Sequence, residues 1–119
     1  MPDERAKSQV AYLHDMLEAA RLIRRYTAGV SLEEFWRNNE KRDAVAMRLS
    51  VLGESAHKID RATEVALPGV PFKRIRGLRN RIAHDYGAVD FRIVWAVVQE
   101  EMTPLIAALE AYLSASGSA

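Results

Sequence analysis

The 119-residue sequence contains no cysteine, which excludes disulfide bonds, thiolate metal sites and a cysteine nucleophile. Aromatic residues make up only 8% of the chain, and six glycines and four prolines are few for a turn-rich all-β fold. No apolar run approaches the roughly 18 residues that a membrane-spanning helix needs. The first residues also lack the apolar core of a signal peptide, so we expect a cytoplasmic protein without a membrane partner.

The length suits one folded domain, which at this size buries about two-thirds of its unfolded surface. The composition, 49% apolar and 28% charged, is ordinary for a soluble globular protein. We therefore predict a single domain over residues 1–113. Residues 114–119 are small and polar, and we expect them to form a flexible C-terminal tail.

The formal net charge of +1 conceals a local excess of positive charge. Between residues 67 and 86 five basic side chains stand against Asp85 alone, which leaves a net charge of −3 on the rest of the chain. The five are Lys73, Arg74, Arg76, Arg79 and Arg81. A run of this kind is commonly a solvated helix face, but its position around a histidine favours an anionic ligand, nucleic acid included.

Apolar residues recur every three or four positions along most of the chain, which predicts amphipathic α-helices. We expect long helices over residues 5–26, 40–63, 71–86 and 91–112, and a short helix over 32–37. Ser31 and Glu34 form a capping box for the short helix, and Asp90 is a natural N-cap for the last one. The predicted fold class is all-α, an antiparallel bundle of four long helices and one short helix.

Two residues stand out inside the predicted helices. Gly53 costs roughly 1 kcal/mol relative to alanine in a helix interior, so we expect another segment to pack closely against it. Pro104 removes a backbone donor and crowds the preceding turn, so it should kink the last helix. Each residue therefore marks a place where packing departs from that of a regular helix.

The segment with the clearest capacity for chemistry, residues 79–86, reads Arg-Asn-Arg-Ile-Ala-His-Asp-Tyr. If Gly87 ends this helix as a C′ residue, Asn80 is a surface neighbour of His84. Arg79 lies about 140° from His84 around the helix axis, so the two should flank one groove. Arginine binds phosphate through two N–H groups, and histidine exchanges protons near neutral pH. The segment therefore predicts a phosphodiester site.

This segment resembles the signature of the HEPN family (higher eukaryotes and prokaryotes nucleotide-binding domain), and specifically its HepT-like toxins. In that signature an arginine is followed after four residues by a histidine and then, one residue on, by a tyrosine, as Arg79, His84 and Tyr86 are here. The similarity extends to Gly53-Glu54, to Pro71-Phe72 and to the stretch from Val89 to Trp95, so it covers nearly the whole chain. The resemblance also implies an α-helical bundle.

By resemblance, the chain would be an endoribonuclease toxin without a cofactor, working as a homodimer and paired with a minimal nucleotidyltransferase (MntA-like) antitoxin. Arg79 would bind the phosphate, His84 would act as general base or acid, and Asn80 would orient a phosphate oxygen or the histidine. The basic residues expected to bind RNA are Lys73, Arg76 and Arg81. Because one motif histidine per chain cannot easily make both proton transfers, a two-fold dimer that apposes two motif helices would complete the site.

Two further roles concern single residues. Glu54 would orient Arg79 if it lies against the motif helix, although a plain exposed glutamate is an equal alternative. In HepT-like toxins the tyrosine of the signature is where the partner nucleotidyltransferase attaches AMP, a role that Tyr86 takes by resemblance. His14 and His57 share no ligand-like spacing with other residues, so we interpret both as structural and predict no metal site.

Two alternatives to a nuclease stay open. The first is a non-catalytic HEPN module that binds a nucleotide or a partner protein. The second is a helical dimer whose basic helix only docks on a nucleic-acid scaffold. The feature that separates them from a nuclease is whether Arg79 and His84 of two chains meet in one cleft.

Overall fold

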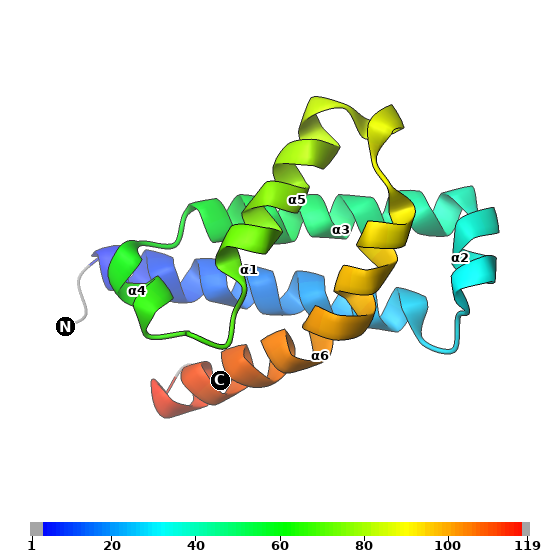
Figure 1. Cartoon of the computed structure of the whole chain (residues 1–119). Helices are drawn as coiled ribbons and strands as arrows, with labels where there is room; N and C mark the ends of the chain where they lie inside the picture. Colours follow the sequence, from blue (N-terminus) through cyan, green and yellow to red (C-terminus); the bar gives the residue numbers. More distant parts are fainter. Residues whose placement is uncertain (1–3, 118–119) are drawn as a thin grey trace.

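The computed structural model describes residues 4–117, with side chains from Gln9 onwards. It contains four long helices, α1 (Glu4–Thr27), α3 (Asn39–His57), α5 (Phe72–His84) and α6 (Phe91–Ala115), and two short ones, α2 (Leu32–Arg37) and α4 (Arg61–Val65), with the 3-10 turn η1 (Tyr86–Ala88) between α5 and α6 (Figure 1). The described residues form no β-strand. The predicted all-α fold is therefore confirmed.

The long helices pack around one apolar core. α1 and α3 lie side by side, α5 packs on α3, α6 packs on α1, and α2 contacts both α3 and α6 (Figure 1). Every long helix contributes buried residues, such as Leu13, Leu52, Ile75 and Leu109. In residues 4–117 no helix combines the length and the apolar character that crossing a bilayer requires.

The third predicted helix ends earlier than expected. We predicted one helix over residues 40–63, but α3 ends at His57 and a separate helix, α4, begins at Arg61. Asp60 caps α4, because its carboxylate accepts a hydrogen bond of 2.8 Å from the backbone N–H of Thr63. Aspartate is a strong N-cap residue, so it starts a new helix in place of extending the old one. The prediction of a continuous helix is wrong for that reason.

The other predicted helix boundaries agree closely with the structure. Ser31 Oγ accepts a hydrogen bond from the N–H of Glu34 at 3.1 Å, and Asp90 accepts one from the N–H of Arg92 at 2.9 Å. Pro104 lies inside α6, and Figure 1 shows this helix changing direction along its length. α6 continues through Ala115, two residues into the predicted tail, whose last two residues, 118 and 119, lie outside the described part of the chain.

Candidate active site

α5 carries the motif and is strongly amphipathic. Its apolar side faces the core through residues spaced three and four apart, which are Phe72, Ile75, Leu78 and Ile82. The polar residues of the motif therefore lie along its outer side and its two edges. This spacing directs the motif away from the core along the whole length of the helix.

The predicted role of Gly87 as the C′ residue of this helix is wrong. α5 ends at His84, because Asp85 leaves the helical region with φ −154° and ψ 89°, and Gly87 lies inside η1. Among the described residues only Gly29 and Gly117 have positive φ. Aspartate readily leaves helices because its side chain competes for backbone hydrogen bonds. Tyr86 consequently stands outside α5.

Arg79 is positioned by a close approach of α5 to α3. A Cβ atom at Gly53 would lie 2.2 Å from the Cβ and 2.7 Å from the Cγ of Arg79, so only glycine fits there. The guanidinium then reaches the next residue of α3, with 2.7 Å between Arg79 Nη2 and Glu54 Oε2. The close packing predicted at Gly53 is confirmed. The orienting role of Glu54 stays a prediction, and this ion pair supports it.

Asn80 pairs with a histidine other than the one expected. Its Oδ1 lies 3.2 Å from Nε2 of His57 and 3.4 Å from Nη1 of Arg79. His57 is the last residue of α3, and nothing in its sequence spacing connects it with the motif. Only the packing of α3 against α5 brings His57 there, so no spacing along the sequence indicated this contact.

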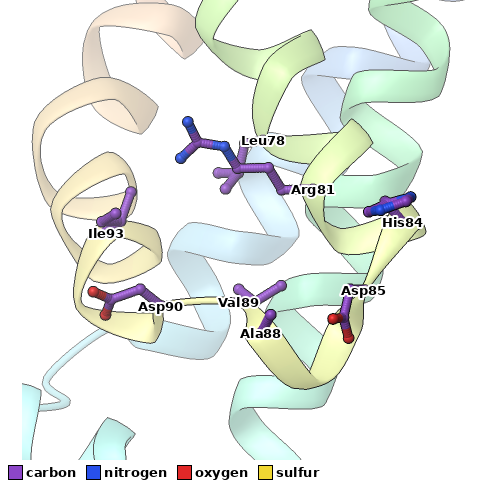
Figure 2. A pocket seen from close by; sticks show the side chains of 8 residues that line it. All are labelled: Leu78, Arg81, His84, Asp85, Ala88, Val89, Asp90 and Ile93. Carbon is purple, nitrogen blue, oxygen red and sulfur yellow. The ribbon is translucent and has the colours of Figure 1, made fainter.

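His84 and Arg79 line different hollows of the chain. His84 borders a hollow of about 400 Å³ between α5, η1 and the start of α6 (Figure 2). In Figure 2, Arg81 extends towards α6 above this hollow, whereas His84 projects from the opposite side of α5, away from Ile93. Arg79 lines a separate hollow between α3 and α5. These two hollows are separate in one chain, and the expectation that Arg79 and His84 flank one groove stays a prediction.

The remaining basic residues differ in how free they are. Arg76 donates two hydrogen bonds to the carboxylate of Glu64, at 3.1 and 3.0 Å, and two to the carbonyl of Ala56, at 3.1 and 2.9 Å. The hydrogen bond from Arg76 is the main cause that lowers the pKa of Glu64. Lys73 and Arg81 are exposed beside a third hollow, which lies along α5. Both are therefore open to a ligand, whereas Arg76 is engaged within the fold.

Tyr86 faces α3. Its hydroxyl donates a short hydrogen bond to Oδ1 of Asp43, and its ring packs edge-on against Phe91 with 5.8 Å between the centroids. Burial, followed by the hydrogen bond to Asp43, raises the pKa of Tyr86 to about 12. The residue is still 41% exposed. Tyr86 lines a hollow that shares Ser50 and Ala83 with the hollow lined by Arg79. Tyr86 and Arg79 therefore lie on the same side of α5.

Within the part of the chain that the structure describes, no three histidine, aspartate or glutamate side chains come together as a set that could hold a metal ion. The site therefore consists of arginine, asparagine, histidine, tyrosine and carboxylate groups around the outer side of α5. Such a set can bind an anion and transfer protons.

The sequence comparisons point to one family. Residues 16–112 match the family model described as "Ribonuclease HepT-like". "Putative RNase MJ1380" of Methanocaldococcus jannaschii is 34% identical over 92 residues, which are 77% of this chain and 84% of the relative. "Probable ribonuclease HepT" of Thermococcus cleftensis is 29% identical over 99 residues, or 83% and 90% of the two chains. No solved structure matches the chain. The chain therefore belongs to the HepT-like ribonuclease family.

Proposed function

We propose that this protein is a metal-independent endoribonuclease, the toxin of a toxin–antitoxin pair, and that Arg79 and His84 carry the cleavage. The observation that supports the proposal most is the outer side of α5, where a guanidinium held by Glu54, an amide and an exposed histidine follow one another. The ribonuclease names of the relatives support RNA as the substrate class.

The reaction that suits these groups is attack by the ribose 2′-hydroxyl on the adjacent phosphorus. A general base removes the hydroxyl proton, a cation stabilises the charge that develops on the phosphate, and an acid protonates the leaving 5′-oxygen. Arg79 is the cation, because its ion pair with Glu54 holds it in place before RNA arrives. His84 is exposed at the helix end and makes one of the two proton transfers.

A homodimer fits this mechanism. One chain holds Arg79 and His84 in separate hollows. A two-fold axis beside the outer side of α5 would bring the motif helices of both protomers to one cleft, and a two-fold dimer is the commonest symmetric assembly. In such a dimer the exposed Lys73 and Arg81 of both protomers would add positive charge for the RNA backbone.

The test is cleavage of RNA by purified variants. We expect His84→Ala and Arg79→Ala each to lower the rate at least about 100-fold, with EDTA leaving the wild-type rate unchanged. His14→Ala is the matched control, because His14 is exposed on α1 and borders another part of the surface. Both site variants should unfold within about 1 kcal/mol of the wild type, since His84 is exposed and the Arg79 side chain is partly exposed. Active His84→Ala protein would refute the proposal.

We also propose that a cognate nucleotidyltransferase antitoxin silences the protein by attaching AMP to Tyr86. The phosphodiester of each AMP could pair with Arg79, which lies on the same side of α5, and the nucleoside would occupy space that RNA needs. Intact mass spectrometry after co-expression should show one or more added AMP masses in the wild type and none in Tyr86→Phe. Full neutralisation of an unmodified protein would mean that the partner acts by binding alone.

A further inference from the structure

Four side chains from α3 and α5 form a continuous chain of contacts. Glu54 binds Arg79, Arg79 reaches Oδ1 of Asn80 at 3.4 Å, and the same oxygen lies 3.2 Å from Nε2 of His57. The guanidinium can only donate, so the Asn80 atom that it meets has to be the carbonyl oxygen. His57 Nε2 shares this acceptor and therefore carries a hydrogen. This assignment leaves Nδ1 as the nitrogen of His57 that can take or give a proton.

The motif histidine, His84, lies one helical turn beyond Asn80 on α5. Asn80 and His84 are four residues apart on α5, so their Cβ atoms lie about 5–6 Å apart along one side of the helix. Asn80 thus contacts His57 and is the helix neighbour of His84, and all three residues are exposed. Among the residues whose side chains the structure describes, none forms a hydrogen bond with Nδ1 of His57. Both histidines are therefore accessible to a ligand that lies over Asn80.

The charges around His57 suit a phosphodiester. Arg79 lines the hollow between α3 and α5 and is paired with Glu54, and Lys58 follows His57 in the chain with its ammonium over the ring of Tyr12. A phosphate over Asn80 would lie beside the guanidinium of Arg79 and the imidazole of His57, with His84 one helical turn further along α5. A purely structural role explains the hydrogen bond between His57 and Asn80 less well, because a hydrogen bond between two exposed side chains adds little stability.

We propose that His57 is a second proton-transfer residue of the site, acting with His84 on one phosphodiester, and that Asn80 is the residue that positions it. The inference rests on the proposed ribonuclease function. One histidine takes the proton of the 2′-hydroxyl as that oxygen bonds to phosphorus. The bond from phosphorus to the 5′-oxygen breaks, and the other histidine, in its protonated form, gives its proton to that oxygen. The products are a 2′,3′-cyclic phosphate and a 5′-hydroxyl.

The test compares His57→Gln and His84→Gln in the full-length protein, with His14→Gln as the control. Glutamine at position 57 keeps an N–H that can bind Asn80 but cannot transfer a proton, so it separates proton transfer from positioning. Each variant is assayed on ordinary RNA and on RNA in which sulfur replaces the leaving 5′-oxygen. A thiolate leaves without being protonated, so the second substrate needs a base but no acid.

We expect both site variants to cleave ordinary RNA at least about 100-fold more slowly than wild type. On the sulfur substrate one of the two should regain a rate near that of the wild type, and this variant identifies the acid. Wild-type cleavage by His57→Gln, beside an inactive His84→Gln, would overturn this inference and leave the proposed function intact. A slow His57→Gln with no rescue of either variant would also overturn it. Wild-type protein that does not cleave RNA would refute the proposed function itself.

Discussion

The hydroxyl of Tyr86 is the group in the candidate site whose proton is held most firmly. Its hydrogen bond to Asp43 exists only while the phenol is protonated. Because the pKa is raised from 10.0 to about 12, the stabilisation is complete below about pH 10 and is lost as the pH rises through 12. We expect the difference in phenolate absorbance between wild type and Tyr86→Phe to show a midpoint near 12.

Asp43→Asn tests the cause of this shift. The substitution removes the carboxylate but leaves the burial of the ring, so the midpoint should move part of the way back towards 10.0. Asp15 is exposed on α1, so Asp15→Asn is the control and should leave the midpoint of the Tyr86 titration unchanged. A midpoint that stays at 12 in Asp43→Asn would mean that burial alone causes the shift.

The packing of α3 against α5 depends on the absence of a side chain at Gly53. Gly53→Ala would force the two helices apart, because its Cβ would overlap the side chain of Arg79, and overpacking of this kind costs about 1–3 kcal/mol. Gly77→Ala is the matched control on α5. Nothing lies within 4 Å of its added Cβ, so it should gain about 0.5–1 kcal/mol of helix stability. Urea unfolding measures both changes, and equal effects would contradict the contact.

Arg76 joins three elements, since it binds Glu64 of α4 and the last turn of α3 from its own place on α5. We expect Arg76→Ala to lower the free energy of unfolding by about 1.5–3 kcal/mol, because it strips a partly buried carboxylate of its charged donor. Arg74→Ala removes a more exposed pair with Glu101 and should cost less than about 1 kcal/mol. Denaturant titration compares the two.

The lowered pKa of Glu64 makes the stability contributed by the contact between Arg76 and Glu64 depend on pH. Because this pKa is lowered in the folded protein, the stabilisation is present above its ordinary value of 4.5 and is lost as the pH falls through the lowered value. In acid, Arg76→Ala should therefore lose the part of its deficit relative to wild type that comes from Glu64, whereas the part from the carbonyl of Ala56 remains. Weaker RNA binding by a fully stable Arg76→Ala protein would instead favour the nucleic-acid role predicted from the sequence.

At the scale of the whole molecule, we expect a dimer at micromolar concentration. The apolar stripes of the helices are buried within the single chain, but Met47 of α3 and Ile93 of α6 stay exposed on the two sides of α5. Apolar side chains of this kind are what a partner protomer covers. Light scattering should show Met47→Glu and Ile93→Glu shifted towards monomer, and Val65→Glu, on α4, unchanged. A monomeric wild-type protein would count against the proposed dimer.

The features of the fold and the site that the sequence predicted are those set by residues close together in the chain. Apolar spacing located the long helices, and the cost of a glycine inside a helix located the approach at Gly53. Asp60 caps the start of α4 and Asp85 follows the end of α5, so the preference of aspartate for helix ends is a local signal for both boundaries. The contacts of Asn80 and Tyr86 with α3 depend on how two helices pack, and no spacing along the chain encodes that.

The hydrogen bond between Tyr86 and Asp43 fastens the turn after α5 to α3. An AMP group on that oxygen would replace the hydroxyl hydrogen, so Asp43 would lose its donor and face a phosphodiester of its own charge. Repulsion would then separate η1 from α3 and free the segment that follows His84. The proposed modification would therefore inhibit in two ways, by filling the space for RNA and by unfastening the part of the chain that holds the motif in place.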